Sequence, residues 1–204
     1  METPTRSRLG AIATAIWVVA VVAGLAILAH YSSTPGSRSV AAASWPAGTD
    51  LSLDADLPTL VICLHATCPC SRASVEELAR IHARVGGAVA MRALLRTPVS
   101  ERTRPPSAVA RRVGEIPGLL VVDDPGGVRS ARLGARTSGE VFLYDPSGAL
   151  RFHGGITAGR GHEGMSAGRR EVESILRGER RDRTPIEVPT FGCPLGDARD
   201  EEAS

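Results

Sequence analysis

The stretch LHATCPCSRAS, residues 64–74, places two cysteines, Cys68 and Cys70, on either side of a single proline. The chain has only four cysteines in 204 residues, so they indicate a local site and not a disulfide scaffold. An apolar run precedes the pair and an amphipathic run follows it. At such a strand-to-helix boundary, the free N–H groups and dipole of the helix N-terminus stabilise a thiolate. The pair is therefore predicted to be nucleophilic and redox-active, although two buried, inert thiols are an alternative.

Two arrangements for thiol–disulfide exchange are open. In the first, Cys68 attacks a substrate disulfide and Cys70 resolves the mixed disulfide. A Cys-x-Cys disulfide closes a small, strained ring, which favours oxidase or isomerase behaviour over strong reduction. In the second, Cys70 pairs with Cys193 of the motif TFGCPLG, and Cys68 is the free attacker. Cys193 joins the candidate catalytic residues because an exposed thiol rarely stays unpaired in an exported protein.

The same atoms could instead bind a metal. Cys63, His65, Cys68 and Cys70 follow the pattern C-x-H-x-x-C-x-C, and thiolate with imidazole suits Cu(I) or zinc. Side chains two apart on a strand share a face, and Cys63 is expected to be a small core residue. The alternative ligand set is therefore Cys68, Cys70, His65 and Cys193, with copper as cofactor, whereas the exchange hypothesis needs no cofactor.

The elements around the cysteines can be predicted from periodicity. The run TLVICLH, residues 59–65, fits a buried strand, and residues 71–85 fit an amphipathic helix. Ser74 and Glu77 have the spacing of a capping box. A second apolar run covers residues 88–95. A strand, a helix and a strand with short connections predict a parallel pair with a right-handed crossover.

The rest of the domain reads as alternating short elements without an internal repeat. Pro146 and Gly148 in the sequence DPSG predict the turn of a β-hairpin. The expected elements are a proline-rich surface loop at 96–107, a helix at 108–116, a strand at 119–124, a short helix at 128–135, strands at 140–145 and 149–155, a glycine-rich loop at 156–168 and a helix at 169–179. One domain over residues 50–180 follows, with a C-terminal tail at 181–204.

Residues 9–29 carry no charge and are apolar. At a rise of about 1.5 Å per residue, a run of about 21 residues spans the roughly 30 Å hydrocarbon core of a membrane. Arg6 and Arg8 precede the run, so the positive-inside rule places residues 1–8 in the cytoplasm. The apolar core of a cleaved signal peptide is shorter, at about 7–15 residues, which favours an uncleaved anchor.

Residues 30–49 are rich in Ser, Gly and Ala and are expected to be a flexible tether. The expected location is the inner, cytoplasmic membrane, with the domain on the periplasmic side. Thiols there face an oxidising compartment. The net charge of +2 gives no electrostatic argument for nucleic acid. The expected partner is a protein thiol or disulfide, and no oligomeric state is predicted.

The order of strand, cysteine-bearing turn, helix, strand, helix, hairpin and helix resembles the thioredoxin fold, an α/β fold with a mixed central sheet flanked by helices. More specifically, TLVICLHATCPC and LLVVDDPGGVRSARLGARTSGEVFLYDPSGALRFHGG resemble membrane-tethered proteins related to TlpA and alkyl hydroperoxide reductase. FGCPL, the CPC pair and GGITAGRGHEG are also similar to RedB-type proteins. The resemblance implies a thiol–disulfide oxidoreductase.

The chain departs from the thioredoxin pattern at two places. Ser71 stands where the second cysteine of C-x-x-C would fall, and Ser138 or Gly139 stands at the place of the family's cis-proline. That proline limits what approaches the sulfurs, metal ions included, so its absence strengthens the alternative of a copper carrier or assembly factor. Thr67 near Cys70 gives a faint likeness to peroxiredoxins, which makes a peroxidase the second alternative.

Three histidines lie outside this motif. His153 and His162 are expected to be solvated or to brace loops, and His82 is expected on the surface of its helix. The arginine runs within residues 169–183 are expected to form a solvated face.

Overall fold

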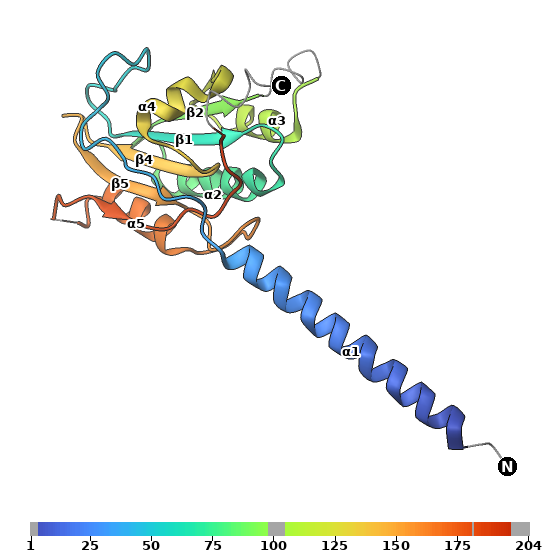
Figure 1. Cartoon of the computed structure of the whole chain (residues 1–204). Helices are drawn as coiled ribbons and strands as arrows, with labels where there is room; N and C mark the ends of the chain where they lie inside the picture. The colour runs from blue at the N-terminus through green and yellow to red at the C-terminus, as the bar shows by residue number, and fades with distance from the viewer. Residues whose placement is uncertain (1–3, 98–104, 181, 197–204) are drawn as a thin grey trace.

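The computed structural model describes residues 4–97, 105–180 and 182–196, and joins a long N-terminal helix to an α/β domain (Figure 1). Part of the expected loop at 96–107 thus lies outside the described residues. In chain order the elements are α1 (Pro4–Ser33), β1 (Thr59–His65), α2 (Pro69–Val85), β2 (Ala90–Arg96), α3 (Ala108–Gly114), β3 (Leu119–Asp123), the 3-10 turn η2 (Pro125–Gly127), α4 (Val128–Leu133), β4 (Glu140–Tyr144), β5 (Leu150–Gly155), α5 (Ala167–Leu176) and β6 (Ile186–Glu187).

The strands form one mixed sheet in the order β3-β2-β1-β4-β5-β6. The predicted parallel pair is confirmed as β1 and β2, and the predicted hairpin is confirmed as the antiparallel pair β4 and β5. Gly148 in the hairpin turn has φ +83°, as its place in the turn requires. A cysteine-bearing turn after β1, and β4 antiparallel beside β1, give the predicted thioredoxin-like fold.

The two faces of the sheet bury separate apolar clusters. One face of β1, β2 and β4 packs against α2, α3 and α5 through a cluster that includes Leu60, Leu78 and Val172. The opposite face packs against α4 and coil segments through a cluster that includes Cys63, Leu133 and Phe142. Each fully buried large aliphatic side chain contributes about 1.5–3 kcal/mol to folding. Both faces of β1, the strand that leads into the cysteine-bearing turn, are therefore covered.

The helix after the cysteines begins earlier than expected. Cys68 occupies the N-cap with extended backbone angles, and Pro69 is the first residue of α2. Proline suits this position because its missing N–H would have no partner inside the helix. The predicted capping box of Ser74 and Glu77 is wrong, since both residues lie buried within the helix. The consequence for function is that Cys68 itself sits at the helix N-terminus.

Helix α1 extends away from the domain (Figure 1) and is longer than the predicted run at 9–29. Within the described chain, Arg8–Ser33 is long and apolar enough to cross a membrane, and none of its most apolar window is buried by the domain. Large apolar side chains such as Trp17 and Ile27 are exposed. Such a surface, apolar all round, fits a membrane span.

The segment expected to be a flexible tether at 30–49 is largely docked on the domain, which corrects that prediction. Its first four residues belong to α1. Residues 36–45, here called the docked segment, then run along β4 and β5: the N–H of Trp45 donates to the carbonyl of Gly148 at 2.7 Å. The Trp45 ring meets Tyr144 edge-on at 5.2 Å between centroids. Burial of this aromatic contact outweighs the flexibility that the Ser/Gly/Ala composition suggests.

The C-terminal tail also returns to the domain. Strand β6, which the sequence analysis does not predict, pairs in parallel with β5. Further on, Leu195 is buried, and its N–H donates to the carbonyl of Arg136 at 2.9 Å. The tail thus carries Cys193 past the end of β1, where the other two candidate cysteines lie.

Candidate redox site

The three candidate catalytic sulfurs meet at the carboxyl end of β1. The Sγ atoms of Cys68, Cys70 and Cys193 all lie within 4.8 Å of one another. Those of Cys68 and Cys193 are 2.7 Å apart, although 125 positions separate the two residues in the chain. Cys68 is buried, whereas Cys70 and Cys193 are half-buried. The sulfurs of Cys68 and Cys193 are close enough for disulfide exchange, and the half-buried Cys193 leaves the pair partly accessible to solvent.

Cys68 is the sulfur that the site favours as a thiolate. Burial raises the pKa of its thiol, but hydrogen bonds from the Cys193 thiol and from the N–H groups of Cys70, Cys193 and Ser71 outweigh burial and lower the pKa overall. The N–H groups of Cys70 and Ser71 belong to the first turn of α2, where N–H groups lack the usual helical partner four residues earlier, although the Ser71 N–H also donates to the carbonyl of Cys68 at 3.1 Å. The stabilisation of a thiolate by the helix N-terminus, expected from the sequence, thus acts on Cys68.

The other two thiols are shifted the opposite way. Burial, and the hydrogen bond to Cys68, raise the pKa of Cys193 to about 12. Burial and the charge on Cys68 also raise the pKa of Cys70. Cys68 is therefore the thiol of the three that loses its proton most easily, whereas Cys70 and Cys193 stay protonated at neutral pH and Cys193 can donate a hydrogen bond to the Cys68 thiolate.

The position of Cys193 depends on the loop before β4. The N–H of Ser138 donates to the carbonyl of Cys193 at 2.8 Å, and Thr137 pairs with Pro194 in an isolated antiparallel bridge. Gly192 lies so close that a Cβ there would meet the Ser138 carbonyl at 1.9 Å. The chain can therefore seat Cys193 beside this loop only because residue 192 is glycine.

The two departures from the thioredoxin pattern contact each other. Ser71 and Ser138 are both buried, and their hydroxyl oxygens are 2.8 Å apart. The Ser138 hydroxyl also accepts from the N–H of His65 at 2.9 Å, while the Ser71 hydroxyl donates to the carbonyl of His65 at 3.1 Å. This serine pair ties the end of β1 to α2 and to the loop before β4. Both departures are visible in the sequence, but their contact could not be predicted from it, because the two serines lie 67 positions apart.

The donor set partly fits a soft metal. Of the described residues, the group able to hold an ion consists of Cys68, Cys70 and Cys193, and His65 is not in it. The His65 Nδ1 instead contacts the hydroxyl of Thr67 at 3.1 Å. Two sulfurs in a tetrahedral zinc site would lie about 3.8 Å apart, given Zn–S bonds of about 2.3 Å. The 2.7 Å between Cys68 and Cys193 is too short for both to bind one ion without moving apart.

The fourth cysteine belongs to the core, as expected. Cys63 is fully buried on the α4 side of β1, among Leu133, Phe142 and their neighbours. Burial raises the pKa of its thiol far above the usual range. Cys63 is therefore kept protonated and away from exchange.

His153 is neither solvated nor in a loop, which corrects the sequence-based expectation. It is buried in β5, where its Nε2 lies 2.6 Å from the Glu140 carboxylate and 2.9 Å from the Ser39 hydroxyl. Ser39, Glu140 and His153 line a pocket of about 370 Å³ beside the docked segment.

The other two histidines lie elsewhere. His82 is half-buried, and its Nδ1 has no hydrogen-bond partner among the described residues. His162 is exposed and braces its loop through a 2.9 Å contact with the carbonyl of Arg160.

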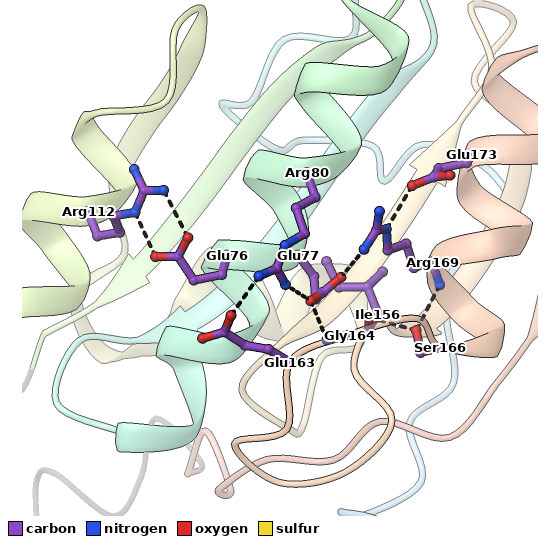
Figure 2. Close-up of polar contacts among 10 residues, drawn as sticks. All are labelled: Glu76, Glu77, Arg80, Arg112, Ile156, Glu163, Gly164, Ser166, Arg169 and Glu173. Carbon is purple, nitrogen blue, oxygen red and sulfur yellow. Dashed lines mark hydrogen bonds and ion pairs between the residues drawn. The ribbon is translucent and has the colours of Figure 1, made fainter.

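A buried ionic network fixes the helix that carries Cys68 (Figure 2). Glu77 of α2 accepts a hydrogen bond from the Arg169 guanidinium of α5 at 2.7 Å, and Arg169 also donates to Glu173 at 2.7 Å. All three side chains are at most 4% exposed. On the other side of α2, Glu76 accepts two hydrogen bonds from Arg112 of α3. Arg169 is thus not part of a solvated face, contrary to the prediction for 169–183.

Comparisons with known proteins agree with the fold. A hypothetical protein from Sinorhizobium meliloti 1021 is 23% identical with a TM-score of 0.52, and the match covers 79% of this chain and 93% of that one. An uncharacterized conserved protein from Geobacillus kaustophilus is 15% identical with a TM-score of 0.56, over 80% and 92% of the two chains. A secreted Mycobacterium tuberculosis disulfide oxidoreductase homologous to E. coli DsbE is 15% identical with a TM-score of 0.43, over 62% and 84%.

No family model and no curated protein matches the chain. At these identities the likeness concerns the fold, and the function rests on the residues of the site.

Proposed function

We propose that this protein is a membrane-tethered thiol–disulfide exchange protein in which Cys68 is the nucleophile and Cys193 the resolving thiol. The observation that carries the proposal is the 2.7 Å separation of the two sulfurs, together with the lowered pKa of Cys68 and the raised pKa of Cys193. Exchange requires a thiolate that attacks and a second thiol within reach of the same sulfur.

In the reducing direction, the Cys68 thiolate attacks one sulfur of a substrate disulfide. The substrate S–S bond breaks, a mixed disulfide forms and the other substrate sulfur leaves as a thiolate. Cys193 then gives up its proton and attacks the Cys68 sulfur, so that the Cys68–Cys193 bond forms and the second substrate thiolate leaves. Two electrons pass from the protein to the substrate, and the same steps in reverse oxidise a substrate dithiol.

Cys70 is the third thiol, and the exchange described above does not require it. Its pKa is raised by burial and by the charge on Cys68, so it stays protonated at neutral pH. This assignment differs from the Cys68–Cys70 pair that the spacing alone suggests.

The membrane arrangement completes the proposal. Helix α1 spans the inner membrane uncleaved, and the arginines before it keep the N-terminus in the cytoplasm. The domain then lies on the periplasmic side, where disulfides persist and where protein substrates present them.

Trapping the mixed disulfide tests the function directly. In the full chain, the double variant Cys70→Ser, Cys193→Ala should accumulate one mixed disulfide at Cys68 when mixed with a peptide that holds a single disulfide. The wild type should release the peptide and keep no adduct, and Cys68→Ser should form none. The proposal fails if Cys68→Ser reduces the peptide as fast as the wild type does, or if the double variant carries its adduct elsewhere.

A copper-binding function is the second candidate, because three sulfurs converge within 4.8 Å. Thiolates are soft ligands that suit Cu(I). Binding by all three would require Cys68 and Cys193 to move apart, as the zinc geometry above indicates. Reduced full-length protein should then retain one Cu(I) after desalting, and Cys68→Ser should lose it. Loss of Cu(I) from the wild type on desalting would rule this candidate out.

A further inference from the structure

Arg160 occupies the tip of a tight turn in the glycine-rich loop between β5 and α5. Gly159 and His162 form an isolated antiparallel bridge, and the N–H of His162 donates to the carbonyl of Gly159 at 3.2 Å. Gly161 has φ +70°, a conformation that favours glycine. The turn therefore fixes the backbone from which the Arg160 side chain extends.

The Arg160 side chain joins two segments that are far apart in the chain. One terminal nitrogen of its guanidinium donates to the carbonyl of Gly192, the residue before Cys193. The guanidinium Nε donates to the carbonyl of Thr34, just after α1, at 3.3 Å. The same group lies 4.9 Å from the centre of the Tyr31 ring, within cation–π distance.

The main chain of Arg160 strengthens the same junction. Its N–H donates to the carbonyl of Ser32 at 2.9 Å, which gives a partner to one of the last carbonyls of α1. A planar guanidinium can donate in two directions while its face covers a ring, and a lysine ammonium cannot reproduce this geometry.

The far end of the loop is fixed to α2, the helix that begins at Cys68. The N–H of Gly164 donates to the buried Glu77 carboxylate at 2.7 Å, and Glu163 pairs with Arg80 at 2.8 Å (Figure 2). The loop thus connects the helix that presents Cys68 to the segment that presents Cys193.

We infer that Arg160 is the positioning residue that holds Cys193 against Cys68 and links this pair to the end of α1. The inference rests on the proposed exchange function and deepens it. When Cys68 and Cys193 are reduced, nothing covalent keeps their segments together, so the hydrogen bond to Gly192 raises the local concentration of Cys193 at Cys68. Holding Cys193 in place depends on the shape of the guanidinium as well as on its charge.

The test is the equilibrium of the full-length protein with reduced and oxidised glutathione in detergent micelles, under metal-free conditions. The fraction of the Cys68–Cys193 disulfide is mapped by alkylation and mass spectrometry. Arg160→Gln and Arg160→Lys should each lower the equilibrium constant for this disulfide about tenfold, which corresponds to about 30 mV for a two-electron couple. Arg170→Gln is the matched control, because Arg170 is an exposed arginine on α5, and it should leave the constant unchanged.

Tyr31→Leu removes only the ring contact and should lower the constant in the same direction by a smaller factor. Tyr31 is exposed, so this variant keeps the domain folded even if Arg160→Gln does not. A constant within twofold of the wild type in Arg160→Lys and in Tyr31→Leu would overturn the inference. A wild type that forms no Cys68–Cys193 disulfide at any glutathione ratio would overturn the proposed function as well, so the two failures are distinguishable.

Discussion

At the scale of single residues, the site separates the protonation states of neighbouring thiols. Cys68 receives hydrogen bonds from the helix N-terminus and from Cys193, whereas burial dominates at Cys193 and Cys63. In the proposed exchange, the first sulfur is the attacker and the second its proton-bearing partner, while Cys63 is a buried part of the core. The assignment follows from where each sulfur lies, since the side chains are chemically identical.

The first prediction concerns the thiolate. Cys193→Ala removes the largest contribution that lowers the pKa of Cys68, so this pKa should rise. Alkylation of reduced Cys68 is fast above its pKa and slows as the pH falls through it. At pH 7 the variant should therefore react about tenfold more slowly, since a hydrogen bond to a charged group contributes about 1.5 kcal/mol. The check is the alkylation rate of Cys68 against pH, read by mass spectrometry.

Cys63→Ala is the control for that experiment, because Cys63 lies in the core and should not affect the rate at Cys68. An unchanged pH profile in Cys193→Ala would contradict the hydrogen bond between the two thiols.

At the scale of elements, helix α2 carries Cys68 at its first turn and is fixed along its length by ion pairs. Its Glu77 is fully buried and depends on Arg169 of α5. Buried charges are tolerated only when they are paired and hydrogen-bonded, so the loss of one partner costs more than the loss of an exposed ion pair.

The second prediction follows from this burial. Arg169→Met leaves Glu77 and Glu173 buried with a shared partner removed, and should lower the free energy of unfolding by about 3–5 kcal/mol. Arg170→Met, next in the chain but exposed, should change it by less than about 0.5 kcal/mol. Urea denaturation of the two full-length variants measures both values. Equal stability of the two variants would show that the network does not support α2.

The third prediction concerns the close approach of the tail to the loop before β4. In Gly192→Ala the new Cβ would meet the carbonyl of Ser138 at 1.9 Å, so the segment that carries Cys193 must move. The equilibrium constant for the Cys68–Cys193 disulfide should fall about tenfold or more, in line with a misplaced thiol. Gly114→Ala, where a Cβ meets nothing within 4 Å, should have no effect. A normal disulfide in Gly192→Ala would mean that this contact does not position Cys193.

At the scale of the whole molecule, the chain between the anchor and the domain is part of the fold. The docked segment at 36–45 and the tail lie beside each other, since the N–H of Gly36 donates to the carbonyl of Thr190 at 2.8 Å. The anchor therefore leads directly into the structure that holds Cys193, without a free tether between them.

The fourth prediction tests this docking. Trp45→Ala removes the edge-on contact with Tyr144 and should lower the free energy of unfolding by about 2 kcal/mol. Val40→Ala, in the same segment but 88% exposed, should have little effect. Thermal unfolding of the full-length variants compares them. A flexible tether at 30–49 would instead make both substitutions equally harmless.

The parts of the fold with strong periodicity could be predicted from the sequence. The apolar run at 59–65, the helix after it and the DPSG turn each depend on neighbours in the chain, and the structure confirms them. The capping box failed because Pro69 starts α2 before Ser74.

The contacts that complete the site could not be predicted in this way. Cys193 meets Cys68 across 125 positions, and Ser71 meets Ser138 across 67, so no local pattern records either contact. The only sequence signal at Arg160 is its place between two glycines, which predicts a turn but not its partners.

The most direct measurement of the central claim is a redox titration of the full-length protein against glutathione buffers of graded potential, without metal, with the disulfides mapped by mass spectrometry. The account predicts a single two-electron transition that forms Cys68–Cys193, in the wild type and equally in Cys70→Ser. A transition that forms Cys68–Cys70 and disappears in Cys70→Ser, or no disulfide at any potential, would contradict it.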